Sequence, residues 1–253
     1  MRTPVIAGNW KMHNTVEESL ALVRGLKALV AGAAGVEIIV APVFTALHAV
    51  AAEITGSNIA LSSQNVFWEE KGAFTGEIAP GMLKDVGCTH AIIGHSERRQ
   101  YFGETDETVN RRVKAALAAG LTPIMCVGET LEEREAGNTL AVVSRQVKGG
   151  LSGLGSAEID KLIIAYEPVW AIGTGKTATP EQAEEVHADI RRLVNDIAGQ
   201  DTAAGIRILY GGSVKPDNVD VLMSQADIDG ALVGGAALKA DSFARIVNFE
   251  TVE

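Results

Sequence analysis

Cysteine and long apolar runs are both scarce in this sequence. Its two cysteines, Cys88 and Cys126, are too few and too far apart for a disulfide framework or a Cys-x-x-Cys metal site. No apolar stretch approaches the roughly 18 residues of a membrane span, and the opening MRTPVIAGNW lacks the basic and apolar regions of a secretory signal. We therefore expect a cytoplasmic protein with reduced thiols and no membrane partner.

Basic and aromatic residues are also in short supply. Lysine and arginine number 22 against 32 aspartates and glutamates, the net charge is -10, and no block of basic residues occurs. This balance disfavours nucleic acid and acidic membrane surfaces as partners. Aromatic residues make up 5% of a chain that is 47% hydrophobic, so its core must consist mostly of Ala, Val, Ile and Leu.

The chain instead alternates short β-branched runs with segments of helical periodicity. That periodicity is clear at Val16–Val30, Thr105–Ala119 and Pro180–Ala198. The β-branched runs are TPVIAGN, EIIVAP, NIALSS, THAIIGH, TPIMCVG, KLIIAYE, IRILYGG and DGALVGG. About eight strand and helix units without a linker predict an α/β protein, a closed (β/α)₈ barrel that forms a single domain over residues 1–253.

Signatures of nucleotide cofactors and of metals fail on inspection. An open, doubly wound sheet usually has a Gly-rich turn after its first strand, where this chain reads NWK at 9–11. GTGKT imitates a P-loop, but the position of the first glycine is Trp170. Residues 173–178 read GxGxxA, yet 168–172 separate them from the preceding strand. The five histidines form no cluster with carboxylates or cysteines, so we expect neither cofactor nor metal.

Polar side chains collect where the predicted strands end, which is where barrels carry their chemistry. Residues two apart on a strand share a face. The pairs that this rule places together are Asn9 with Lys11, Ile93 with His95, and Ala165 with Glu167. If those faces line the barrel, an amide, an ammonium, an imidazole and a carboxylate converge on one pocket. Taken singly, each has an ordinary alternative as a solvated or turn residue, His95 for example as a loop residue before the helix cap Ser96.

Glycine pairs end the last two predicted strands, at residues 211–212 and 234–235. Either pair alone is most simply a turn. At the ends of consecutive last strands, however, the backbone N–H groups of such turns often bind phosphate in barrels. A site of this kind holds a dianion without many basic side chains, which reconciles the acidic chain with an anionic small-molecule substrate.

Seven segments, in order along nearly the whole chain, resemble the triosephosphate isomerase family. They are AGNWKM at 7–12, GAFTGEI at 72–78, GHSERR at 94–99, CVGE at 126–129, AYEPVWAIGTGK at 165–176, YGGSV at 210–214 and LVGGAAL at 232–238. The resemblance implies a TIM barrel that interconverts dihydroxyacetone phosphate and D-glyceraldehyde 3-phosphate through an enediolate, without cofactor or metal.

The resemblance also assigns roles to residues that match these segments. Glu167 becomes the base that moves the proton, and His95 the group that polarises the carbonyl oxygens; the family is itself a known example of a carboxylate base paired with a neutral imidazole. Asn9 and Lys11 would contact the intermediate and the phosphate. The residues implied to support these groups or to cradle the phosphate are Ser96, Glu97, Gly173, Ser213, Gly234 and Gly235.

The segment after Glu167 resembles the lid of the family, which excludes water while the intermediate exists. Its implied hinges are Pro168 to Trp170 and Lys176 to Ala178, with a tip from Ala171 to Gly175 that includes Ile172. The implied latch pairs Glu129 with Trp170 and places Tyr210 and Ser213 against the closed tip.

The stretch Gln64–Ala79 is too long and too mixed for an ordinary connection. It resembles the loop through which family members form a homodimer, with Thr75 reaching the Asn9 and Lys11 region of the partner; a tetramer is the alternative. The sequence departs from the family at His13, where Asn is common, and at Ala237, where Ser is common.

Two other functions fit the sequence less well. An aldolase-type barrel needs a Schiff-base lysine inside the barrel, and no predicted strand interior offers one. A catalytically silent phosphate-binding barrel should have lost Glu167, His95 or Lys11, and all three are present.

Overall fold

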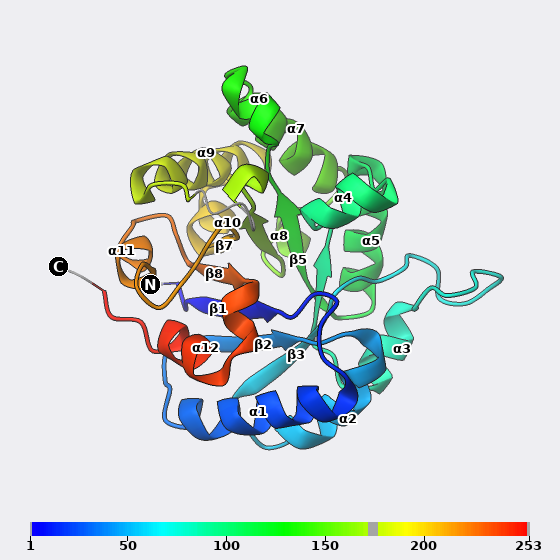
Figure 1. The fold of residues 1–253 in the computed structure, drawn as a ribbon. Coiled ribbons are helices and arrows are strands. Elements are labelled where there is room, and N and C mark those ends of the chain that lie inside the picture. Colours follow the sequence, from blue (N-terminus) through cyan, green and yellow to red (C-terminus); the bar gives the residue numbers. More distant parts are fainter. Residues whose placement is uncertain (1, 172–176, 252–253) are drawn as a thin grey trace.

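The computed structural model describes residues 2–171 and 177–251. Eight parallel strands close into a barrel in chain order, with β8 paired to β1 (Figure 1). The strands are β1 (Val5–Asn9), β2 (Glu37–Ala41), β3 (Ile59–Ser63), β4 (His90–Ile93), β5 (Thr122–Val127), β6 (Ile163–Tyr166), β7 (Arg207–Tyr210) and β8 (Gly230–Val233). The predicted (β/α)₈ barrel is therefore confirmed, with every strand inside the run predicted for it.

Helices surround the barrel on its outside (Figure 1). They are α1 (Val16–Val30), α2 (Leu47–Ile54), α3 (Pro80–Asp85), α4 (Ser96–Phe102), α5 (Asp106–Ala118), α6 (Leu131–Glu135), α7 (Thr139–Gly150), α8 (Ser156–Ile159), α9 (Pro180–Ala198), α10 (Gln200–Gly205), α11 (Val219–Met223) and α12 (Ala240–Val247). The short 3₁₀ turns among the described residues are η1 (Phe44–Ala46), η2 (Val169–Ala171) and η3 (Gly235–Leu238). No helix in the described part of the chain is long and apolar enough to cross a membrane.

Threonine caps explain where several helices begin. Thr15, Thr105, Thr130 and Thr179 each accept the backbone N–H of the residue three positions later, at the starts of α1, α5, α6 and α9. Such a bond satisfies one of the N–H groups that a helix leaves free at its first turn. In α9 the next residue is Pro180, which suits the first helical position because it has no N–H to satisfy.

Aliphatic side chains fill the barrel interior, as the low aromatic content predicts. The interior cluster contains Val5, Ala7, Ile39, Ala41, Ile92, Ile124, Cys126, Ile163, Ala165, Leu209 and Leu232. Its members alternate along each strand with residues that pack outward under the helices. The barrel is thus a packed core on which residues at the carboxyl ends of the strands rest.

A charged cluster closes the opposite, amino-terminal end of the barrel. Glu37 on β2 accepts from His90 Nε2 on β4 at 3.0 Å and from Arg207 Nη1 on β7 at 3.1 Å. The hydrogen bond from His90, together with Arg207, lowers the pKa of Glu37 in spite of partial burial. The cluster therefore ties three strands that are not neighbours in the barrel.

His187 of α9 is buried between the rings of two tyrosines near the carboxyl ends of β6 and β7. Its ring centroid lies 5.8 Å from that of Tyr166 and 6.3 Å from that of Tyr210. Burial lowers the pKa of His187 to about 3, although the carbonyl of Asp227 beside Nδ1 opposes the shift. The imidazole is therefore neutral in the folded protein.

This buried histidine predicts a loss of stability in acid. The pKa of His187 is about 3 when folded and 6.5 when unfolded, so the unfolded chain binds the proton first. The share of the unfolding free energy that depends on the neutral His187 is complete above pH 6.5 and is lost as the pH is lowered towards 3. At about 1.36 kcal/mol per pH unit, roughly 2 kcal/mol is lost between about pH 6.5 and pH 5.

The test compares the protein with His187→Gln by urea unfolding across this pH range, at fixed protein concentration. We expect the difference in unfolding free energy between the two proteins to change with pH along that slope. A difference that stays constant would show that His187 does not carry the acid sensitivity.

Candidate active site

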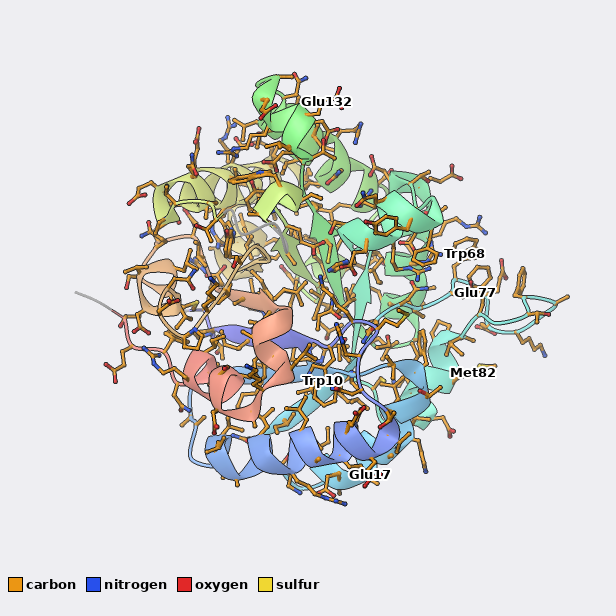
Figure 2. The ribbon with its side chains drawn as sticks, viewed as in Figure 1. Trp10, Glu17, Trp68, Glu77, Met82 and Glu132 are labelled. Atoms are coloured by element: carbon orange, nitrogen blue, oxygen red, sulfur yellow. The ribbon has the colours of Figure 1, made fainter. Side chains whose placement is uncertain are left out.

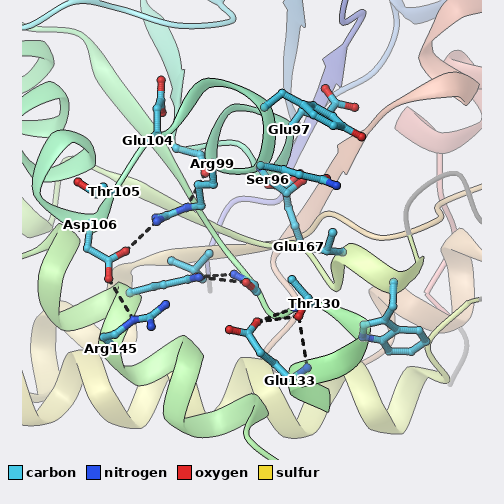
Figure 3. Close-up of a pocket in the computed structure, with 18 of the residues that line it drawn as sticks. Ser96, Glu97, Arg99, Glu104, Thr105, Asp106, Thr130, Glu133, Arg145 and Glu167 are labelled. Atoms are coloured by element: carbon cyan, nitrogen blue, oxygen red, sulfur yellow. Dashed lines mark hydrogen bonds and ion pairs between the residues drawn. The ribbon is translucent and has the colours of Figure 1, made fainter. Parts of the chain in front are cut away.

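A cavity of about 280 Å³ opens at the carboxyl ends of the strands. Its walls include nine of the residues selected from the sequence, namely Asn9, Lys11, His95, Glu167, Gly211, Gly212, Ser213, Gly234 and Gly235. A larger cavity of about 940 Å³ adjoins it and shares Glu167 as a wall. Figure 3 shows Ser96 beside Glu167 at this second cavity. The catalytic candidates thus lie together, although they come from separate strands.

The Glu167 carboxylate follows β6 and is almost completely buried, with 2% of the residue exposed. Its Oε1 lies 2.8 Å from His95 Nε2, and its Oε2 accepts the backbone N–H of Ser96 at 3.0 Å. Burial alone would raise the pKa of Glu167, but the His95 ring, the Ser96 N–H and the Lys11 charge together lower it. The site therefore holds an ionised carboxylate in the protein interior.

His95 reaches the cavity by a different route from the one predicted. The prediction that Ile93 and His95 share the interior face was wrong, because Ile93 packs outward under the helices. The strand ends there, and Gly94, with a left-handed φ of 70°, turns the chain so that His95 faces Glu167. Alternation along the strand therefore does not determine the face that His95 occupies.

The hydrogen bonds of the His95 ring define its tautomer. Nδ1 accepts the backbone N–H of Glu97 at 3.2 Å, so this nitrogen carries no proton and Nε2 donates to Glu167. Burial lowers the pKa of His95, but the neighbouring Glu167 carboxylate raises it more while the two groups are in contact.

Lys11 is held in an uncommon backbone conformation, with φ at 52°. Asn9 Oδ1 accepts its N–H at 3.0 Å, and Gln64 Nε2 donates to its carbonyl at 2.7 Å. Its Nζ lies 2.7 Å from Glu97 Oε1, so Glu97 supports Lys11 as expected. Strained residues of this kind persist where the surroundings over-determine them, often at functional sites. Sequence reasoning missed Gln64, whose contact with Lys11 has no local signal.

The turns after β7 and β8 form the cavity wall opposite the strand 4 segment. A Cβ at Gly211 would lie 2.8 Å from Glu167 Cγ, and one at Gly212 would lie 2.2 Å from the Tyr210 hydroxyl. Glycine is therefore required at both positions by close packing. Ala237, one of the two departures from the family, is buried in η3 against Gly8, whereas His13 is exposed.

The segment after Glu167 begins with Pro168 and the 3₁₀ turn η2, which contains Trp170. Trp170 Nε1 donates to Glu129 Oε1 at 2.9 Å, and the Arg134 guanidinium lies 4.7 Å from the Trp170 ring. Glu129 is itself fully buried and also accepts from Arg134 and Tyr166. The first residues of the segment after Glu167 are therefore anchored on the loop after β5.

The other expected lid residues are placed only in part. Ala178 is buried, and its backbone N–H faces the hydroxyl of Tyr210. Burial raises the pKa of Tyr210 to about 12, and the Ala178 N–H opposes the rise. Ile172, Gly173 and Lys176 lie outside the described residues. Within the described ranges, no group of three or more His, Cys, Asp or Glu side chains could hold a metal ion.

Comparison with known proteins agrees with this geometry. Residues 4–250 match the profile of the family described as triosephosphate isomerase. The chain is 65% identical to the triosephosphate isomerase of Pelobacter propionicus, over 98% of this chain and 99% of that one. It is 62% identical to that of Geobacter metallireducens, over 99% and 100% of the two chains, and 60% identical to that of Moorella thermoacetica, over the same shares.

Proposed function

The chain belongs to the triosephosphate isomerase family, and from this premise we propose that Glu167 is the base of its isomerisation reaction. The reaction interconverts dihydroxyacetone phosphate and D-glyceraldehyde 3-phosphate. The observation that carries the assignment is the buried, ionised carboxylate at the mouth of a barrel, in direct contact with an imidazole. A solvated surface acid would have neither the burial nor the partner.

Glu167 takes a proton from the carbon next to the carbonyl. The electron pair of the broken C–H bond forms the carbon–carbon double bond of an enediolate, and the carbonyl oxygen gains the negative charge. The charged oxygen then gains a proton and the other oxygen loses its hydroxyl proton, an exchange for which the Nε2–H of His95 is the available carrier. The same carboxyl returns its proton to the neighbouring carbon as the new carbonyl forms, which completes the isomerisation without any cofactor. One carboxyl group can serve both steps because the two carbons are adjacent.

His95, Lys11 and Asn9 stabilise the charge that develops on the substrate oxygens. The Nε2–H of His95 points at Glu167 in the structure and is free to donate to the substrate oxygens once substrate lies between them. Lys11, at the cavity wall, supplies a fixed positive charge, and Glu97 keeps its ammonium in place. Groups held in position before the reaction stabilise such charge most effectively.

The substrate phosphate would bind at the turns after β7 and β8. Ser213, Gly234 and Gly235 line the cavity there, and a Cβ at Gly235 would meet open space, so this turn leaves room for a ligand. Family similarity adds Gly173 to this cradle and assigns the segment after Glu167 as a lid. The Glu129 and Trp170 contact supports the lid assignment, since it fixes the hinge next to the base.

The alternative, a catalytically silent phosphate-binding barrel, has no observation in its favour. The carboxylate, the imidazole and the ammonium all line one cavity.

We also propose a reducing compartment, the cytoplasm, since both Cys88 and Cys126 are buried free thiols.

Substitution of Glu167 by Asp tests the role of the base. The change keeps the charge but draws the carboxylate back by roughly 1 Å, and misplacement on that scale can lower the rate about 100-fold. We expect kcat to fall by that factor, about 2.7 kcal/mol at about 1.36 kcal/mol per tenfold. KM and the melting temperature should change little, since the phosphate site is untouched.

The measurement is an isomerisation assay on the pure protein in EDTA without nucleotide. Glu107→Asp, at an exposed position at the start of α5, is the matched control and should retain full activity. Absence of turnover by the unmodified protein would contradict the proposed reaction. A kcat for Glu167→Asp within twofold of the unmodified protein would instead remove Glu167 from the mechanism.

We further propose a homodimer formed through the segment 64–79. This segment projects from the barrel between β3 and α3 (Figure 1), and Thr75 near its end is exposed. Figure 2 shows Trp68 and Glu77 on it, and the Arg111 guanidinium stacks 4.0 Å from the Trp68 ring centroid. Phe74 on this segment is a large apolar side chain exposed to solvent, which association through the segment would cover.

Sedimentation at micromolar concentration should give twice the 26.6 kDa mass of the chain, or four times for a tetramer. Thr75→Arg should shift the protein towards monomer and lower its activity, because a long charged side chain cannot be seated at a packed contact without a partner. A fully active monomer would contradict the proposal.

A further inference from the structure

The side-chain amide of Gln146, on α7, holds both backbone groups of Gly128. Its Oε1 accepts the Gly128 N–H at 2.7 Å, and its Nε2 donates to the Gly128 carbonyl at 3.1 Å. Gln146 is 5% exposed, so water does not compete for these bonds. The amide thus pairs with the chain just beyond the end of β5, as a neighbouring strand would.

The backbone of Gly128 lies directly against that of Glu167. A Cβ at Gly128 would lie 1.8 Å from the Glu167 carbonyl oxygen, so no side chain separates the two segments. The Glu167 N–H donates to the Val127 carbonyl at 2.7 Å, and the Val169 N–H donates to the Glu129 carbonyl at 3.0 Å. A displacement of the Gly128 peptide must therefore be passed to the residue that bears the base.

We propose that Gln146 is a positioning residue for Glu167 and acts through Gly128. The inference rests on the proposed role of Glu167 as the base. We call the two hydrogen bonds between Gln146 and Gly128 the clamp. Because the rate of proton transfer is sensitive to displacements of the base by about 1 Å, loss of the clamp should lower kcat. Phosphate binding depends on the turns after β7 and β8, so KM should change much less.

Gln146→Met removes both hydrogen bonds and keeps a side chain of similar length. We expect kcat to fall by at least about tenfold, with KM within about threefold of the unmodified protein. The matched control is Asn110→Leu. Asn110 Nδ2 donates to the carbonyls of Gly150 and Ser152 at the far end of α7, 2.8 and 3.0 Å away. This variant should lose stability but keep kcat within about twofold.

Gln146→Glu gives a readout that a merely structural residue would not move. When protonated, the introduced carboxyl can accept the Gly128 N–H and donate to the Gly128 carbonyl, as the amide does. When ionised, it can no longer donate. The kcat of this variant relative to the unmodified protein should therefore rise as the pH is lowered from about 8 to 6, because burial raises the pKa of such a group. The same ratio for Asn110→Leu should stay flat.

Crystal structures of the unmodified protein, Gln146→Met and Gln146→Glu provide a test that needs no turnover. We expect the Gly128 peptide and the Glu167 backbone to shift together in Gln146→Met. A Glu167 backbone that does not move in Gln146→Met, or a kcat of that variant within twofold of the unmodified protein, overturns the inference.

If Gln146→Met does not fold, the pH profile and the structure of Gln146→Glu decide, and a flat pH profile overturns the inference. An inactive unmodified protein contradicts the proposed reaction, whereas the backbone shift still tests the clamp.

Discussion

The burial of an ionised carboxylate is the constraint on which the site depends. Removing a charge from water is unfavourable by several kcal/mol unless other groups compensate. Glu167 receives that compensation from the His95 ring and the Ser96 N–H, both of which belong to the segment after β4. The acid at the end of β6 is therefore stable only because the segment after β4, two strands away in the barrel, ends beside it.

Close contact between strand ends follows from this arrangement, and glycine makes it possible. Gly94 turns the chain after β4, while Gly128 and Gly211 bring the ends of β5 and β7 against Glu167. At Gly94 a Cβ would also lie 2.7 Å from a Val109 methyl group. These glycines thus serve the close packing of strand ends around Glu167.

The sequence allowed the barrel to be predicted, together with most of the residues that line the candidate cavity, because both depend on local patterns. Strands alternate with helices, and the proposed catalytic residues lie at or just after strand ends. The orientation of His95 could not be derived by alternation, since Gly94 interrupts the strand geometry. Gln64 and Gln146 were missed because their partners lie 53 and 18 residues away in the chain, and an isolated glutamine carries no pattern of its own.

The charged cluster of Glu37, His90 and Arg207 gives the barrel two chemically distinct mouths. The carboxyl-terminal mouth holds the proposed catalytic groups. Substitutions there that raise stability are expected to lower turnover, because stability and activity commonly conflict at such sites. At the amino-terminal mouth, substitutions can change stability without affecting turnover, because the packed aliphatic interior separates this mouth from the site. Thermal tolerance can therefore be tuned, by drift or by engineering, at the amino-terminal mouth while catalysis is conserved at the opposite one.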